Sequence, residues 1–259
     1  MKIISLNLVL LFLLSCSSAL KNPSKVKLLN WGSGQSFDRL TRSQFKADFF
    51  KLSNFFVSQD NKIYCGLASS AIVLNALKLG SSHVVPVDNS SILKTERDFL
   101  PKSYDPFFAK YTQNNVLNRA TKSKRQVLGK PVVIAGKEKS DYGLQLKQLA
   151  RVLESNGATL RYKVVTKTVN DLEVRKELLK NLKSKNDYVL VNYSRSVLGQ
   201  KGGGHISPVA AYDQASDSFL VMDVNVNKAP WVWVDASLLI SAMRTFDTVE
   251  NRGYLLVSN

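Results

Sequence analysis

Cysteine and histidine are scarce in this chain, which limits the metal and disulfide chemistry that it can hold. The 259 residues include two cysteines, Cys16 and Cys65, and two histidines, His83 and His205. If Cys16 belongs to an export segment, one thiol remains, which is too few for an internal disulfide or a structural zinc site of the Cys/His type. We therefore expect no metal site in the protein. A lone thiol in an exported protein is either buried and inert or reactive for a purpose.

The chain also lacks an apolar run long enough to span a bilayer stably. Its start combines Lys2, an apolar stretch over 8–14 and small residues over 15–19, which predicts a signal peptide over 1–19. Leu13-Leu14-Ser15-Cys16 resembles a bacterial lipobox, in which Cys16 would be lipidated. Ser17-Ser-Ala19 would instead suit a signal peptidase that leaves no lipid. We expect an exported, periplasmic protein and favour a lipoprotein anchored through Cys16.

Acidic residues are few compared with basic ones. Lys and Arg number 36 against 20 Asp and Glu, a formal net charge of +16. The excess is spread out, and the chain has no arginine-rich tract or recognisable nucleic-acid motif, so a soluble basic surface is the simplest interpretation. No repeat or Gly/Ser linker divides the remainder. We predict a tether over 20–34 and a single domain over 35–258.

The pattern of apolar residues predicts an α+β fold, with helices packed on a mainly antiparallel sheet. Helices are expected from Cys65 to about 79 and over 143–155 and 171–184. Strand-like runs cover 158–165, 188–193, 204–212, 219–224 and 253–257.

Cys65 opens the first of these helices. Free backbone N–H groups and the helix dipole at that position favour a thiolate, the reactive form of cysteine. Gln59, six residues earlier, carries an amide that could donate to an oxyanion forming beside the sulfur. This arrangement of glutamine and cysteine is typical of papain-like enzymes.

A cysteine nucleophile needs a base and a group that orients the base. His205 begins a strand that is followed by a turn-rich segment and a second strand ending at Asp223. The positions 205 and 223 average to 214, inside the turn, so an antiparallel hairpin would bring the imidazole and the carboxylate together. His83 is the only rival base, and its surroundings in the sequence offer no orienting carboxylate. Each signal is weak alone, and their combination with Gln59 favours a catalytic site.

These residues resemble a known family, the phytochelatin synthases (glutathione γ-glutamylcysteinyltransferases). The resemblance covers roughly 35–258 and is carried by the segments 59–77, 191–195, 203–208 and 220–224. It implies a papain-like catalytic domain with Cys65, His205 and Asp223 as the catalytic triad and Gln59 in the oxyanion hole. The family's plant and fungal members add a cysteine-rich C-terminal region that has no counterpart before Asn259, so the chain looks like the short bacterial form.

The resemblance implies acyl transfer on glutathione through a γ-glutamylcysteinyl thioester on Cys65, with release of glycine. A second glutathione would then take the acyl group to give phytochelatin, or water would take it to give γ-glutamylcysteine. No cofactor is expected, and heavy-metal ions such as Cd or Zn would enter as glutathione thiolates. The expected partners are glutathione, such thiolates and a second copy of the chain, with no nucleic acid and with membrane contact only through lipid. The substrate-binding residues that it implies are Asn192, Arg195, Gly204, Asp247 and Arg252.

Two alternatives remain open from the sequence. A papain-like cysteine peptidase would use the same triad, and only its pocket would differ. A periplasmic lipoprotein that binds thiols or metal thiolates without turnover would need no such set of residues. The acid and base at Asp247 and Arg252 favour an amino-acid-like substrate terminus and so the transferase.

Overall fold

A seven-stranded antiparallel sheet forms the centre of the protein. The computed structural model describes residues 27–78 and 82–259, so the predicted signal peptide and Cys16 lie outside the described residues. The strand order is β1-β8-β7-β6-β5-β9-β4, and every neighbouring pair is antiparallel. The strands are β1 (Leu28–Asn30), β4 (Thr159–Val164), β5 (Asp187–Ser194), β6 (Gly204–Asp213), β7 (Ser218–Val221), β8 (Val232–Asp235) and β9 (Gly253–Ser258). The expected α+β fold with a mainly antiparallel sheet is confirmed.

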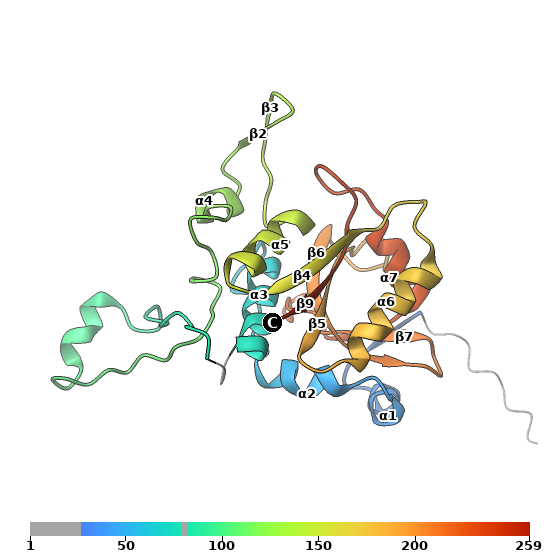
Figure 1. The fold of residues 1–259 in the computed structure, drawn as a ribbon, viewed down its shortest axis with the longest axis horizontal. Helices are drawn as coiled ribbons and strands as arrows, with labels where there is room; N and C mark the ends of the chain where they lie inside the picture. Colours follow the sequence, from blue (N-terminus) through green and yellow to red (C-terminus); the bar gives the residue numbers. More distant parts are fainter. Residues whose placement is uncertain (1–26, 79–81) are drawn as a thin grey trace, which may run out of the picture.

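Both faces of the sheet are covered by helices (Figure 1). In β5, Tyr188 and Leu190 pack into one hydrophobic core and Val189, Val191 and Tyr193 into the other, because successive side chains of a strand point to opposite faces. On the first face lie α2 (Ala47–Asn54), α3 (Cys65–Lys78) and α5 (Leu146–Ser155), and on the second lie α6 (Asp171–Lys183) and α7 (Ala236–Met243). A strand buried on both faces is rich in consecutive apolar residues, as β5 is from Tyr188 to Val191.

The remaining elements are α1 and several shorter ones. They are α1 (Gly34–Arg42), the 3-10 helix η1 (Lys94–Phe99), α4 (Lys124–Val127), and the hairpin formed by β2 (Val132–Ile134) and β3 (Lys137–Lys139). The segments that carry η1 and the hairpin extend away from the sheet (Figure 1). Within the described parts of the chain, no helix is long and apolar enough to cross a membrane.

Helix α3 is buried on all sides rather than along one stripe. Every residue from Gly66 to Lys78 is buried, since α3 lies between the sheet and the irregular segment that contains Tyr111. The side chain of Asn75 joins the two, because its Oδ1 accepts from the backbone N–H of Tyr111 and its Nδ2 donates to the carbonyl, both at 2.8 Å. A helix that is apolar all round belongs in a core, and this one holds Cys65 on a fixed support.

Two predicted boundaries differ from the structure. The predicted tether over 20–34 includes strand β1, which pairs with β8, and the first residue of α1, so the folded domain already includes residue 28. The helix predicted from 143 begins at Leu146, because Gly143 has φ +69°, a left-handed conformation that a helix cannot include.

Candidate active site

Cys65 stands at the first position of α3, as predicted. Its helix is fixed to β6 by Ser69, whose hydroxyl donates to the carbonyl of Ile206 at 3.1 Å. Gly66 is packed so closely that a Cβ there would lie 3.0 Å from a methyl group of Leu144. The sulfur is hydrogen-bonded to His205 and to the backbone at Ile206 and Gly66. The N-terminus of α3 and the start of β6 thus meet at the thiol.

The surroundings of Cys65 and His205 favour a thiolate–imidazolium pair. Burial alone would raise the pKa of the Cys65 thiol, but the hydrogen bond and charge of His205, with the backbone contacts, bring the pKa below its ordinary value. Burial likewise lowers the pKa of His205, yet its hydrogen bonds to Asp223 and Cys65 raise the pKa above its ordinary value. Each ion of the pair stabilises the other, Asp223 further stabilises the imidazolium, and the backbone at Ile206 and Gly66 further stabilises the thiolate.

His205 and Asp223 meet, with the hairpin register offset from an exactly opposite pairing. Nε2 of His205 lies 2.9 Å from Oδ1 of Asp223, which leaves Nδ1 for the thiol. The hairpin pairs Val209 with Val221, and its register shifts between Val209 and Ala211, so position numbers sum to 430 or more rather than 428. Asp223 therefore lies beyond the end of β7 and reaches back to the imidazole. The predicted contact is present, with the two residues about two positions from directly opposite each other.

Asp223 is fully buried and is held by several donors. Arg195 forms an ion pair with it at 2.6 Å, and the backbone N–H of Asn225 donates to Oδ1 at 2.8 Å. Burial would raise the pKa of this carboxyl, but the hydrogen bond from His205, the charges of His205 and Arg195 and the Asn225 contact hold it below its ordinary value. Asp223 is consequently a stable carboxylate facing the imidazole.

Arg195, which the resemblance assigns to substrate binding, lies against Asp223 and Gln200. Its side chain is 3% exposed, with one Nη on Asp223 and the other donating to Gln200 at 3.0 Å. A guanidinium engaged in this way orients the Asp223 carboxylate, and a contact of Arg195 with substrate stays a prediction.

The backbone of Gln59 is held next to Asp223. Its backbone N–H donates to the carbonyl of Val224, next to Asp223, at 2.8 Å. Nε2 donates to the carbonyl of Asn61 at 2.6 Å, while Oε1 is buried and has no partner among the described residues. An amide nitrogen carries two hydrogens, so Nε2 keeps one for another acceptor. If the Gln59 amide were rotated by half a turn, its Oε1 would face the carbonyl oxygen of Asn61 and the two would repel. The contact with Asn61 therefore fixes which way the amide points.

Gln113 binds the chain on both sides of Gln59, at Ser58 and Asp60. The sequence alone did not indicate this role. Nε2 of Gln113 donates to the carbonyl of Ser58 at 2.9 Å and to Oδ1 of Asp60 at 3.0 Å, and its Oε1 accepts from the backbone N–H of Asp60 at 2.9 Å. Gln113 is itself buried. No local pattern indicates this contact, because 53 residues separate the partners.

Four of the predicted substrate-binding residues lie together. Oδ1 of Asp247 is 3.0 Å from an Nη of Arg252, and its Oδ2 accepts from Asn192 at 3.2 Å. Gly204, the neighbour of His205, is so close that a Cβ there would lie 2.8 Å from the Arg252 guanidinium. Nε of Arg252 is buried without a partner within the described chain. The cluster therefore presents an acid and a base next to the imidazole.

His83, the other histidine considered as a base, lies far from Cys65. His83 follows the C-terminal end of α3, where its Nε2 lies 3.1 Å from Lys78, roughly 20 Å along the helix from Cys65. Among residues 27–78 and 82–259 there is no group of three or more His, Cys, Asp or Glu side chains that could hold a metal ion.

Comparison with known proteins places this site in a family. A family model described as phytochelatin synthase matches residues 21–91 and 100–254, which include Gln59, Cys65, His205 and Asp223. The chain belongs to the phytochelatin synthase family. Two relatives are the glutathione gamma-glutamylcysteinyltransferases 2 and 1 of Arabidopsis thaliana, which are 26% identical over 240 residues and 29% identical over 213 residues. These alignments cover 92% and 81% of this chain and 45% and 37% of the relatives.

A third phytochelatin synthase relative is the glutathione gamma-glutamylcysteinyltransferase of Schizosaccharomyces pombe, 26% identical over 215 residues, which are 81% of this chain and 43% of that protein. The chain thus spans less than half the length of these relatives. Family membership agrees with the papain-like arrangement seen here, in which a cysteine opens a helix and a histidine and an acid face it from an antiparallel sheet.

Proposed function

We propose that this protein is a cysteine-dependent acyltransferase that cleaves the Cys–Gly bond of glutathione. The observation that carries the proposal is the continuous contact from the Cys65 thiol through His205 to the buried carboxylate of Asp223. The curated relatives named glutathione gamma-glutamylcysteinyltransferases supply the substrate class.

In the acylation step the Cys65 thiolate attacks the Cys–Gly carbonyl carbon of glutathione. The remaining N–H of the Gln59 amide and the backbone N–H groups near the sulfur stabilise the oxyanion. His205, held by Asp223, gives its proton to the departing glycine amine as the C–N bond breaks. The product is a γ-glutamylcysteinyl thioester on Cys65, which a second glutathione or water then removes.

Asp247 and Arg252 supply the pocket for the γ-glutamyl end of the substrate. That end carries a free ammonium and a free carboxylate, which a paired acid and base match. The unpartnered Nε of Arg252 and the amide of Asn192 add further donors. A peptidase for ordinary peptides needs no such pair, so the cluster favours the transferase.

Two isomeric tripeptides test the proposal. Glutathione and Glu-Cys-Gly joined by an ordinary α-peptide bond have the same atoms but present different N-terminal groups. We expect glycine release from glutathione and little from its isomer. Equal release from both would indicate a general peptidase, and no release from either would contradict the proposal.

Changes at Asp247 and Arg252 should act on substrate recognition. We expect D247N and R252K each to lower kcat/KM for glutathione about 10- to 100-fold, mainly through a higher KM, since each weakens a contact to a charged group. Steady-state kinetics of glycine release measures this. R42K, which alters an arginine paired with Asp213 at the opposite end of β6 from Gly204, is the control and should change kcat/KM little. Unchanged kcat/KM in both pocket variants would remove this pocket from the account.

The sequence of the first 19 residues supports a proposal for where the enzyme acts. We infer that it acts outside the cytoplasm, tethered through a lipid on Cys16, and that Cd or Zn reaches it as a glutathione thiolate. Exposed apolar side chains at Val84, Phe99 and Phe108 favour binding to a second copy of the chain. Globomycin sensitivity of processing tests the lipid, and light scattering of the purified domain tests the dimer.

A further inference from the structure

A buried ion pair outside the triad lies between the start of α3 and the loop that carries Asp247. Nζ of Lys122 is 2.9 Å from Oδ2 of Asp141, and the two side chains are 6% and 3% exposed. Burial would raise the pKa of the Asp141 carboxyl, but the hydrogen bonds of Lys122 and Gln148 and the Lys122 charge hold the pKa below its ordinary value. Asp141 is therefore a carboxylate, and neither charge takes part in the proposed acylation.

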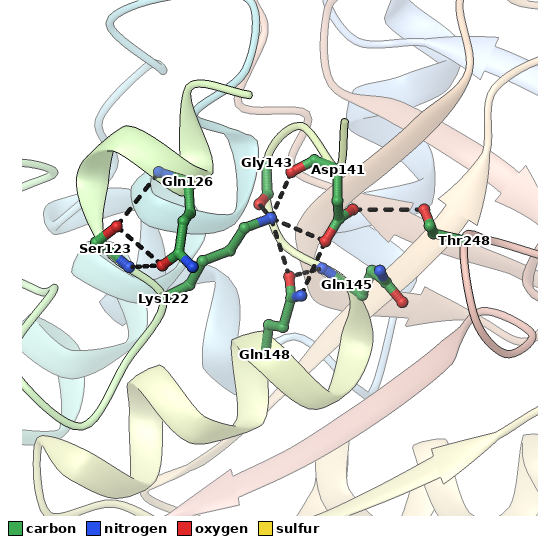
Figure 2. Close-up of polar contacts among 8 residues, drawn as sticks. All are labelled: Lys122, Ser123, Gln126, Asp141, Gly143, Gln145, Gln148 and Thr248. Carbon is green, nitrogen blue, oxygen red and sulfur yellow. Dashed lines mark hydrogen bonds and ion pairs between the residues drawn. The ribbon is translucent and has the colours of Figure 1, made fainter. Parts of the chain in front are cut away.

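Lys122 fixes the backbone of the segment 141–144 (Figure 2). Its Nζ donates to the carbonyl groups of Asp141 and Gly143, the second at 2.9 Å. These two carbonyls and the Asp141 carboxylate match the three N–H donors of an ammonium. The backbone N–H of Gly143 donates to the carbonyl of Val127 at 2.9 Å. Both polar backbone groups of Gly143 are thus held from the side of α4.

The start of α4 in turn directs the lysine. The backbone N–H of Ser123 donates to Oε1 of Gln126 at 2.9 Å, and the backbone N–H of Gln126 donates to the Ser123 hydroxyl at 3.4 Å. Such a capping box fixes the backbone at the beginning of a helix. Because Lys122 immediately precedes it, the lysine side chain leaves the backbone from a fixed point and points toward Asp141 (Figure 2).

The same segment contacts the chain on both sides of Cys65. A Cβ on Gly66 would lie 3.0 Å from a methyl group of Leu144, and a Cβ on Gly143 would lie 3.2 Å from the carbonyl oxygen of Ile63. The backbone at Gly66 is hydrogen-bonded to the Cys65 sulfur. Because these contacts are so close, the segment cannot shift without moving the start of α3.

Asp141 also reaches the loop of the proposed γ-glutamyl pocket. Its Oδ1 accepts from the hydroxyl of Thr248 at 3.4 Å, a long contact. Thr248 follows Asp247, whose carboxylate pairs with Arg252. The backbone N–H of Asp247 donates to the carbonyl of Glu250 at 2.8 Å and closes the loop. One carboxylate therefore connects the segment beside the nucleophile with the loop of the pocket.

An apolar pair could fill this space but could not fix it. Replacing a buried ion pair with hydrophobic residues of similar volume often leaves stability unchanged or higher. Apolar side chains, however, have no donors for the carbonyl groups of Asp141 and Gly143. A buried polar network whose members are all satisfied makes its surroundings rigid. The benefit expected from the Lys122–Asp141 pair is therefore position rather than stability.

We infer that Lys122 and Asp141 are positioning residues, which set the places of Cys65 and the Asp247 loop relative to each other. The inference rests on the proposed function and adds to it two residues that touch neither the substrate nor the reacting atoms. They act on the thiol through Gly66 and on the pocket loop through Thr248. Loss of the pair changes two separable properties, the ionisation of Cys65 and the KM for glutathione.

An apolar replacement of the pair tests the link to Cys65. The Gly66 contact lowers the pKa of the thiol, so its loosening raises that pKa. In K122M/D141L we expect the pH profile of Cys65 alkylation by iodoacetamide to move about one unit toward higher pH, which slows alkylation about tenfold near neutral pH. Thermal unfolding should show a Tm close to that of the wild type.

R42M/D213L is the matched control, since it removes an ion pair of a buried aspartate at the end of β6 far from Gly204. Its alkylation profile should equal that of the wild type. An unchanged profile in folded K122M/D141L, or an equal shift in the control, would overturn the inference.

Thr248 tests the link to the pocket without disturbing the buried charges. Valine has the shape of threonine without the hydroxyl, whereas serine keeps the hydroxyl. We expect T248V to raise the KM for glutathione about threefold with kcat unchanged, since one weak hydrogen bond is lost, and T248S to keep the wild-type KM. Equal KM values in the two variants would overturn the inference, including the case in which K122M/D141L does not fold. A wild type that releases no glycine would refute the proposed function, whereas the alkylation profiles would still decide the link to Cys65.

Discussion

D223N is expected to slow glycine release from glutathione about 10³- to 10⁴-fold. The Asp223 carboxylate fixes the His205 imidazole through Nε2, and an amide in its place can present N–H where the imidazolium needs an acceptor. The variant also loses the negative charge that raises the pKa of His205. The imidazolium would therefore deprotonate at lower pH, and the alkaline limb of the pH–rate profile should move toward lower pH.

Stability must be separated from chemistry in this test, because D223N leaves the buried Arg195 without its ion-pair partner. The double variant R195Q/D223N removes the stranded charge and should be equally slow. D213N is a matched control. It also replaces a buried aspartate that forms an ion pair, here with Arg42, and Asp213 lies at the end of β6 far from His205. Activity of folded R195Q/D223N within about tenfold of wild type would contradict the orienting role of Asp223.

The second large effect is expected at Gln59. Loss of one oxyanion donor typically costs about 10²- to 10³-fold in the chemical step, so Q59A should slow acylation of Cys65 by that factor with little change in KM. Q113M should slow acylation about tenfold, because Gln113 fixes the backbone on both sides of Gln59. Single-turnover formation of the acyl-enzyme measures both.

A double-mutant cycle distinguishes positioning from general support. If Gln113 acts through Gln59, Q113M should have no further effect in the Q59A background. N114A, at the next position, which is exposed, is the control for local disturbance. Additive losses would mean that Gln113 supports the fold rather than the oxyanion donor, and a fully active Q59A would remove Gln59 from the mechanism.

The core of the fold and the triad could be predicted because their signals are local. Strand β5 contains the apolar run Tyr188–Val191, α3 begins at Cys65, and the turn after β6 folds Asp223 back toward His205. The exact register could not be predicted, since the irregularity between Val209 and Ala211 depends on packing rather than on a residue pattern.

Other features depend on contacts between distant parts of the chain. Strand β1 has three residues, too few for a periodic signal, and it is defined by its pairing with β8. Gln113 and Lys122 lie in irregular segments where a polar residue looks like surface, and only the tertiary fold shows that each is buried and multiply bonded. The burial of Arg195 against Asp223 likewise depends on the tertiary fold and has no signal in the sequence.

Mass spectrometry of the intact protein after brief mixing with glutathione tests the central claim most directly. The account predicts a mass increase equal to one γ-glutamylcysteinyl group on the wild type, with release of one glycine, and no increase on C65A. A thioester is labile to hydroxylamine, so that treatment should remove the added mass. D223N should form the same adduct when the reaction is quenched late enough to allow for its slower rate. The absence of that adduct from D223N, or its presence on C65A, would disagree with the account. A wild-type protein that carries no adduct and releases no glycine would contradict the claim that Cys65 is an acyl-transfer nucleophile.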